Sequence, residues 1–423
     1  MPDILVLGAT GFTGRIVTRY LHTHPNRSSF SFAIGGRSRS KLSALVDELK
    51  LDESVEVIEF NANDDASVEV AVQRVKVVIN MVGPYWLYGT PIVRACAKHG
   101  VHHVDITGET HWVKDIIEQF DSTARKTGSI IVPSCGFDSI PSDMSVHLSA
   151  KTLKTALGPD TTLGESRTIA TLHAGVSGGT LASILTGVEE VPRDKLRAAR
   201  LPYALSPIQG QTKPGTHLLY RLPILRPEQY GGQFPPAPHS IAMVHRTWAL
   251  LQNQGSPASA YGKDFTYDEF GAAGGRVSAI SFSLAMEFGL FCLLHVPPVR
   301  WLIKRVGPAA GTGPSDEALE KGSMEVINVT STVPSPDTPQ THVKTVIRGR
   351  GDPGYILTSI MVIEAALCLL DRSKLPEIGR DGGILTPMTA FGDVLVERLK
   401  ANERFEIESA LVTGDEVDGK KTM

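Results

Sequence analysis

The chain has 423 residues, of which 42% are hydrophobic and 21% charged, and its formal net charge is -3 at pH 7. A chain of this length exceeds one comfortable hydrophobic core, so we expect two domains. The near-neutral charge excludes the basic surface that nucleic acid requires, and the four cysteines are too widely spaced for a disulfide framework or a zinc site. We therefore expect a cytoplasmic protein with no nucleic-acid partner and no metal. No signal peptide is expected, because strand residues begin at Ile4.

The first element is an apolar run, Ile4 to Leu7, that passes directly into a glycine-rich turn. Three glycines at three-residue spacing, placed between a strand and a helix, let backbone N–H groups approach a pyrophosphate at the helix N-terminus. The residues predicted to form this dinucleotide site are Gly8, Thr10, Gly11, Phe12, Thr13 and Gly14. A glycine triplet alone is weak evidence, so the elements that follow decide its meaning.

The second apolar strand, Phe30 to Ile34, is followed by basic residues and not by an acid. An acid at this place binds the free ribose 2′-hydroxyl, whereas cations accommodate a 2′-phosphate. Arg37, Ser38 and Lys41 are suited to charge-assisted hydrogen bonds with such a phosphate. The pattern favours NADP over NAD; the alternative is a solvated basic loop.

Strands and helices continue to alternate up to residue 157. Further strands are expected at Val55 to Phe60, Lys76 to Met81, His102 to Ile106 and Ser129 to Pro133. Helices are expected at Thr10 to Leu21, Leu42 to Leu49, Ala66 to Val72, Thr90 to His99, Trp112 to Arg125 and Met144 to Leu157. This alternation predicts an α/β fold with a doubly wound parallel sheet, a Rossmann domain over residues 1–157.

Two loops follow strands of this predicted sheet, at the edge where such folds bind ligands. In the loop after the fourth strand, Val82, Gly83 and Pro84 are predicted to pass beneath the nicotinamide, the alternative being a Gly-Pro turn. In the loop after the sixth strand, Asp138 is predicted to be functional, whereas Asp143 is predicted to cap the next helix.

The pattern changes near Gly158, where we place the domain boundary. A strand at Ser166 to His173 and a hairpin of strands at Glu325 to Val333 and Thr341 to Arg350 predict a second, mixed-sheet α/β domain over residues 158–352. Residues 193–275 show no clear pattern. Helices are expected again from Asp352 to Leu370 and from Pro387 to Leu399, before a tail that is expected to be disordered from about residue 414.

The most apolar segment, Ala279 to Val296, has Glu287 near its centre and a basic, aromatic stretch after it. Three structures fit this pattern: a buried helix, an interfacial helix, and a true membrane span. We rank them in that order, because an acid at the centre of a span is costly in lipid.

These residues together resemble the saccharopine dehydrogenase-like oxidoreductases, in particular the branch of trans-acting enoyl reductases. The motifs that carry the resemblance are residues 8–14, 36–38, 80–85, 105–109, 136–143, 177–180, 351–355 and 383–387. The resemblance implies that the second domain is inserted before C-terminal helices, 353–423, that pack back on the first domain. It also implies contact with a membrane or lipid droplet. We further expect a homodimer.

The predicted proton donors all follow strand ends on the ligand-binding edge: Tyr85, Glu109, Cys135 and Asp138. Of these, Tyr85 and Asp138 are the predicted catalytic residues. No tyrosine is followed four residues later by lysine, so the residue pair of short-chain dehydrogenases is absent.

Three functions remain open at this point. The first is an NADPH-dependent reductase of a lipophilic or carrier-bound enoyl or acyl substrate. The second is a saccharopine-type amino-acid dehydrogenase, whose substrate carboxylates call for arginines such as Arg167, Arg221, Arg226, Arg246 and Arg276. The third is a non-catalytic NADP-binding protein at a membrane surface.

Overall fold

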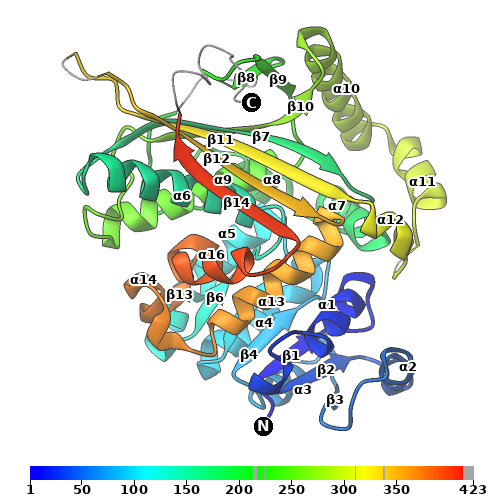
Figure 1. Ribbon diagram of the computed structural model, residues 1–423. Helices are drawn as coiled ribbons and strands as arrows, with labels where there is room; N and C mark the ends of the chain where they lie inside the picture. The colour runs from blue at the N-terminus through cyan, green and yellow to red at the C-terminus, as the bar shows by residue number, and fades with distance from the viewer. Residues whose placement is uncertain (213–216, 223, 310, 337–338, 413–423) are drawn as a thin grey trace.

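The protein is built around two seven-stranded sheets, which lie one above the other in Figure 1. The computed structural model describes residues 1–412 except 213–216, 223, 310 and 337–338. The first sheet is parallel throughout, in the order β13-β6-β5-β4-β1-β2-β3. The second is mixed, in the order β14-β12-β11-β7-β10-β9-β8. The predicted Rossmann sheet with a second mixed-sheet α/β region is confirmed.

The first sheet forms from the alternating elements of the N-terminal part. Its strands are β1 (Ile4–Leu7), β2 (Phe32–Gly36), β3 (Glu56–Glu59), β4 (Val77–Asn80), β5 (His102–Asp105), β6 (Ile130–Val132) and the short β13 (Gly383–Ile384). Its helices are α1 (Phe12–His22), α2 (Arg39–Leu49), α3 (Asp65–Val72), α4 (Tyr85–His99), α5 (Thr110–Thr127) and α6 (Ile140–Leu157). Every residue of β1 and β4 is buried, as expected of strands covered by helices on both faces.

Two helix starts in this part differ from the prediction. Helix α4 begins at Tyr85 and not at Thr90, because the Glu109 carboxylate accepts hydrogen bonds from its first N–H groups. Helix α6 begins at Ile140, so Asp143 lies inside the first turn. The capping role predicted for Asp143 is wrong: its buried carboxylate accepts a hydrogen bond from the Met388 N–H at 3.0 Å.

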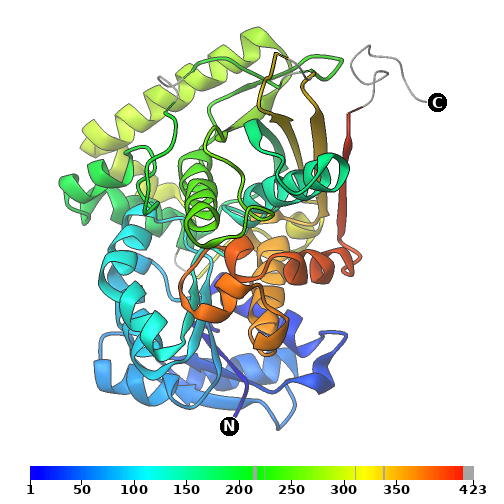
Figure 2. The ribbon, with the colours of Figure 1, turned by 90° about the vertical axis from the view of Figure 1, so that its left-hand side faces the viewer.

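The second sheet draws its strands from the middle and the end of the chain. They are β7 (Leu163–His173), β8 (Tyr220–Leu222), β9 (Gln229–Gly232), β10 (Thr266–Ala273), β11 (Ser323–Thr332), β12 (His342–Arg350) and β14 (Phe405–Leu411). The predicted hairpin is confirmed, since β11 and β12 pair antiparallel from Ser323↔Arg350 to Ser331↔His342. Helices α6 and α9 (Ala237–Gln254) pack on this sheet, on its side toward the first domain, as Figure 2 shows.

The unassigned segment 193–275 contains regular structure. It forms α8 (Arg193–Ala199), β8, β9, α9 and β10. Helix α9 is buried along most of its length and has a proline in its first turn. Proline is favoured there, because it lacks an N–H and its φ suits a helix start.

The C-terminal part connects the two sheets. It contains a π-helical turn, η2 (Pro353–Leu357), α13 (Thr358–Cys368), α14 (Glu377–Asp381), α15 (Pro387–Ala390) and α16 (Asp393–Lys400). Helix α13 packs against α1, β4 and β5, whereas β14 joins the second sheet beside β12. The single helix expected at 387–399 is two helices, interrupted at Gly392, whose φ is 49°. The tail from about residue 414 lies outside the described residues.

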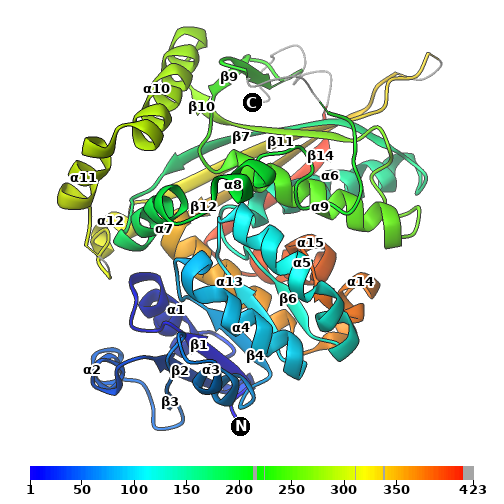
Figure 3. The same ribbon diagram turned by 180° about the vertical axis from the view of Figure 1, so that it is seen from behind.

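The most apolar segment forms α10 (Arg276–His295), followed by α11 (Pro297–Val306). Only Ala279 and Ser283 of α10 are buried, so the predicted buried helix is wrong. The reason is geometric: α10 packs through these two residues onto Gly232 at the end of β9, and the rest of the helix projects from the sheet (Figure 3). The other elements of this side are α7 (Gly178–Glu189) and α12 (Asp316–Glu320).

Candidate functional site

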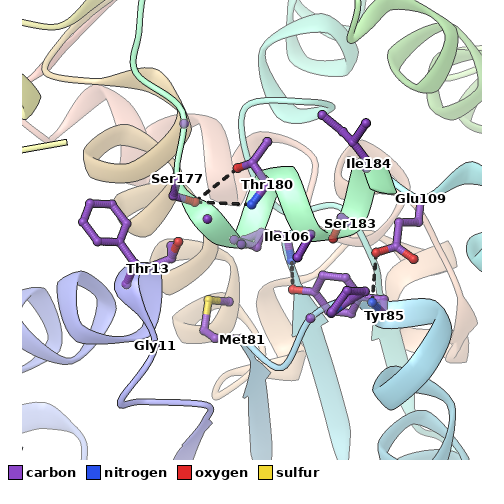
Figure 4. A pocket seen from close by; sticks show the side chains of 18 of the residues that line it. Gly11, Thr13, Met81, Tyr85, Ile106, Glu109, Ser177, Thr180, Ser183 and Ile184 are labelled. Carbon is purple, nitrogen blue, oxygen red and sulfur yellow. Dashed lines mark hydrogen bonds between the residues drawn. The ribbon is translucent and has the colours of Figure 1, made fainter. Parts of the chain in front are cut away.

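A cavity of about 1070 Å³ lies between the carboxyl edge of the first sheet and the elements of the second domain above it. The predicted residues that line it are Gly8, Thr10, Gly11, Phe12, Thr13, Gly14, Arg37, Lys41, Val82, Gly83, Pro84, Tyr85 and Asp138. Figure 4 shows Gly11, Thr13, Met81 and Tyr85 facing residues of α7. Ser38 is not a lining residue; its hydroxyl caps α2 by accepting a hydrogen bond from the Lys41 N–H at 3.4 Å.

The glycines of the first turn create a cradle that only glycine permits. A Cβ at Gly8, whose φ is 79°, would lie 2.8 Å from the Met81 carbonyl oxygen, and one at Gly14 would lie 2.2 Å from the Gly8 carbonyl oxygen. The N-terminus of α1 has no side-chain cap and no acid in its first turn. Its free N–H groups and the helix dipole therefore suit a pyrophosphate.

The far end of the cradle carries the two predicted cations. Arg37 and Lys41 are exposed at the cavity, together with Asn61 and Asn63 beyond β3. Neither cation is engaged in an ion pair with a described acid, so both are free to bind the 2′-phosphate of NADP.

Replacing both Arg37 and Lys41 with alanine should raise the Kd for NADPH by about 100-fold and change the Kd for NADH by less than about threefold. Each charge-assisted hydrogen bond contributes about 1.5–3 kcal/mol, and NADH has no 2′-phosphate to lose. Fluorescence titration with the two nucleotides measures the difference. An equal loss for both would place the cations at the shared pyrophosphate.

The loop after β4, which is predicted to pass beneath the nicotinamide, is held from both sides. The Val82 N–H donates to Asn80 Oδ1 at 3.0 Å. The Tyr85 hydroxyl donates to the Asn80 carbonyl at 2.9 Å and accepts from the Ile106 N–H at 3.3 Å. Burial raises the pKa of Tyr85 well above its usual value. This hydroxyl is therefore engaged by the ends of β4 and β5, and its catalytic role stays a prediction.

Of the other two residues expected near the nicotinamide, Glu109 lines the cavity and Cys135 does not. The Glu109 carboxylate accepts from the N–H groups of Tyr85 at 2.9 Å and Trp86 at 2.8 Å, so it anchors the start of α4 and the loop before it. Burial raises the pKa of Glu109. The Cys135 thiol is buried, donates to the Val132 carbonyl at 3.3 Å, and does not line the cavity.

Asp138 presents a carboxyl group to the cavity. Its side chain has no hydrogen-bond partner among the described residues, and Gly108 leaves room for it, since a Cβ there would lie 2.9 Å from Asp138 Oδ2. Burial raises the pKa of Asp138 to about 6. Behind it, burial and, to a smaller extent, the charge of Asp138 raise the pKa of Glu269 on β10 to about 7. The Tyr267 hydroxyl donates to Glu269 Oε2 at 2.8 Å. With a pKa of about 6, Asp138 carries its proton below about pH 6 and is mostly ionised at pH 7.

Two histidines that sequence reasoning missed also line the cavity. His239 on α9 hydrogen-bonds through its ring nitrogens to the hydroxyls of Thr110 at 2.8 Å and Ser134 at 2.9 Å. His111 on α5 lies near Glu109, with 3.8 Å between Nε2 and Oε2. Burial lowers the pKa of each to about 4, so both are neutral at pH 7. The available sequence signal was the proline-rich stretch 235–238, because prolines of this kind mark a helix start and so place His239 in the first turn of α9.

The second domain covers the nucleotide site through the loop before α7. Asp352 accepts hydrogen bonds from the N–H groups of Gly175 at 2.7 Å and Gly354 at 2.9 Å. The Ser177 N–H donates to the Tyr355 hydroxyl, and the Tyr355 ring packs edge-on against Phe12 at 5.0 Å between centroids. These contacts fix the start of α7 above the cradle.

The Rossmann sheet, the glycine cradle and the two free cations define an NADP-dependent oxidoreductase. Residues 4–132 match the saccharopine dehydrogenase NADP binding domain. A Mycobacterium tuberculosis protein with a provisional trans-acting enoyl reductase name is 34% identical over 417 residues, covering 94% of this chain and 95% of the relative. The trans-acting enoyl reductase of Mycobacterium ulcerans is 31% identical over 418 residues, with the same coverage of both chains. The chain belongs to the saccharopine dehydrogenase-like oxidoreductases, in the branch of trans-acting enoyl reductases.

A solved structure agrees with this assignment at the level of the fold. The apo saccharopine dehydrogenase (L-Glu forming) of Saccharomyces cerevisiae aligns with a TM-score of 0.52 at 14% identity. The alignment covers 98% of this chain and 100% of the yeast chain. At this identity the likeness concerns the fold alone.

Proposed function

We propose that the protein uses NADPH to reduce the carbon–carbon double bond of a lipophilic or carrier-bound enoyl thioester. The observation that carries this proposal is the apolar wall at the second-domain end of the cavity, which is continuous with the dinucleotide cradle. The wall consists of Ile184 and Val188 of α7, Leu196 of α8, and Leu290, Leu293 and Leu294 of α10. Such a wall suits an acyl chain.

The arginines that an amino-acid substrate would need lie elsewhere. Arg221, Arg226 and Arg276 gather around Glu228 on the exposed surface. Arg246 is buried and donates to the carbonyls of Leu205 and Ile384, and Arg167 pairs with Glu165. None of the five lines the cavity, and Arg200 after α8 is the single arginine or lysine among the described residues at its second-domain end, so the saccharopine-type alternative finds no cluster of cations there for its carboxylates.

The roles of the residues follow from their positions. The N-terminus of α1 binds the pyrophosphate, the cations Arg37 and Lys41 bind the 2′-phosphate, and the loop at Val82 to Pro84 supports the nicotinamide. NADPH held by these residues would supply a hydride for the β-carbon of the enoyl group. Asp138, in its acid form, donates its proton to the α-carbon and recovers a proton from solvent. The neutral histidines His111 and His239 add no charge that would attract a carboxylate.

The proposal is tested by the loss of nicotinamide absorbance. The enzyme with NADPH and enoyl thioesters of increasing chain length should consume the nucleotide, fastest with longer chains. The enzyme with NADP and saccharopine should not reduce it. Turnover with saccharopine alone would contradict the proposal, and NADPH binding without turnover of any substrate would favour the non-catalytic alternative.

Replacing Leu293 with tryptophan should lower kcat/KM for long-chain enoyl thioesters by about tenfold or more and leave a four-carbon substrate unchanged. A larger side chain fills the apolar end, and a poor fit in an apolar pocket costs about 1–3 kcal/mol. Phe291→Trp is the matched control, because Phe291 lies on the same helix but does not line the cavity. Equal losses for both chain lengths would mean that the acyl chain lies elsewhere.

A further inference from the structure

Helix α10 exposes apolar side chains on nearly all sides. It has 20 residues, the mean hydropathy of its most apolar window is 1.9, and only 11% of that window is buried. Phe288 and Phe291 are 69% and 56% exposed. Soluble proteins rarely present an apolar surface of this length without a function for it. This surface has no partner among the described residues.

The segment after α10 continues the apolar surface and adds positive charge. Trp301, Leu302 and Val306 of α11 are exposed, and the Arg305 guanidinium lies over the Trp301 ring at 5.4 Å. From residue 288 to residue 315 the charged residues are Arg300, Lys304 and Arg305, with no aspartate or glutamate. Arg300 and Lys304 pair with Glu189 of α7, so Arg305 is the cation left beside the exposed apolar and aromatic side chains, and this combination suits the surface of an anionic bilayer.

The ends of this helix pair are fixed to the same body, which favours an orientation along a membrane and not across it. α10 follows β10 of the second sheet, and Arg300 folds α11 back by donating to the Leu293 and Leu294 carbonyls at 2.9 and 3.2 Å. Lys304 Nζ lies 2.7 Å from Glu189 Oε2 on α7. Glu287, at the centre of α10, accepts from Gln233 Nε2 at 2.6 Å. Both helices lie along one outer side of the molecule (Figures 1 and 3).

We propose that α10 and α11 bind the surface of an anionic lipid bilayer, and that the substrate passes from this surface into the cavity beneath α10. The last turns of α10 contain both residues that line the cavity and residues that would face the lipid. Leu290, Leu293 and Leu294 line the cavity, whereas Phe288 and Phe291 do not and are exposed. An acyl chain that leaves the lipid beside α10 would therefore stay in apolar surroundings until it meets the apolar wall. The transfer step, but not the binding to lipid, rests on the proposed reductase function.

Flotation of the full chain with vesicles tests the binding. Vesicles of phosphatidylcholine mixed with phosphatidylglycerol should carry the protein upward, and pure phosphatidylcholine vesicles should carry less. The variant Phe288→Ser/Phe291→Ser/Trp301→Ser should lower vesicle binding by about tenfold for each ring removed. The control, Val70→Ser/Leu157→Ser, removes exposed apolar side chains from α3 and α6 and should bind vesicles like the wild type.

Turnover assays separate the transfer step from the reductase function. The triple variant should reduce a short, soluble enoyl thioester at the wild-type rate but lose at least about tenfold on a long-chain thioester embedded in vesicles, because it no longer binds the vesicles. A wild-type protein that stays in the soluble fraction with both vesicle types overturns the proposal. The proposal is also overturned if the triple variant binds vesicles like the wild type but changes from dimer to monomer in light scattering. In that case a second copy of the chain, and not lipid, would cover α10. Vesicle binding without reduction of either substrate would support the lipid contact and contradict the reductase function.

Discussion

Replacing Asp138 with asparagine should lower kcat for enoyl reduction by about 10²–10⁴-fold and leave the Kd for NADPH unchanged. General acid catalysis contributes a factor of this size, and asparagine keeps the shape of the side chain without a proton to donate. The carboxyl group faces the cavity without a described partner, so its loss leaves no protein atom unpaired. Steady-state kinetics together with a nucleotide titration measures both quantities.

The role of Asp138 as proton donor also predicts how kcat/KM changes with pH. The proton donor is active in its acid form, and burial raises the pKa of Asp138 to about 6. In the wild type, kcat/KM should therefore be flat below about pH 6 and fall by about tenfold per pH unit above the pKa of the donor. Glu269 has the higher pKa of the two and is still largely neutral when Asp138 ionises, so Glu269→Gln should leave the fall near the same pH. The two carboxyls titrate as a pair, so the profile reports the pair.

Asp143→Asn is the matched control for this experiment. Asp143 lies in the first turn of α6, burial raises its pKa to about 6 as well, and it does not line the cavity. This variant should keep the alkaline fall in kcat/KM, whereas Asp138→Asn should lose it. A fall that persists in Asp138→Asn, or full turnover in that variant together with an inactive Tyr85→Phe, would assign the proton to another group.

The sequence predicts the first domain well because each of its units is local. Each strand is a short apolar run, each helix follows within a few residues, and each parallel pair joins units of the same kind. The errors in this part are at helix starts. Helix α4 begins early because Glu109, far along the chain, accepts from its first N–H groups, and such a contact leaves no mark in the local sequence.

The second domain is harder to predict because distant segments build it. β10 lies between β7 and β9, and β14 reaches the same sheet from the end of the chain. The strands β8 and β9 are short, and β9 ends in two glycines, so neither shows the alternation of a long half-buried strand. α10 is the reverse case: its composition suggested a core helix, but only two of its residues reach the sheet.

The site divides in the same way. The cradle is predictable, because the tight turn and the close approach of α1 to β1 both require glycine within one short segment. The environment of Asp138 is not, because Glu269 and His239 come from elements more than a hundred residues further along. The sequence placed Tyr85 and Asp138 on the same edge of the sheet. It could not show that backbone groups hydrogen-bond the Tyr85 hydroxyl, whereas the Asp138 carboxyl has no described partner.

Replacing Gly14 with alanine should lower the free energy of unfolding by about 3 kcal/mol and weaken NADPH binding by about 100-fold. Gly14 lies inside α1, where alanine normally stabilises a helix by about 1 kcal/mol. Here the sign reverses, because the new Cβ would lie 2.2 Å from the Gly8 carbonyl oxygen and 2.9 Å from its carbon. Only backbone movement relieves this contact, and it would displace α1 from the turn that holds the pyrophosphate.

Gly289→Ala provides the control for that reversal. Gly289 lies in the middle of α10, and a Cβ there would meet nothing within 4 Å. This variant should gain about 0.5–1 kcal/mol and bind NADPH like the wild type. Urea unfolding measures the stabilities and fluorescence titration the affinities. If Gly14→Ala were as stable as Gly289→Ala and bound NADPH normally, the close packing of α1 on β1 would not be what selects glycine at position 14.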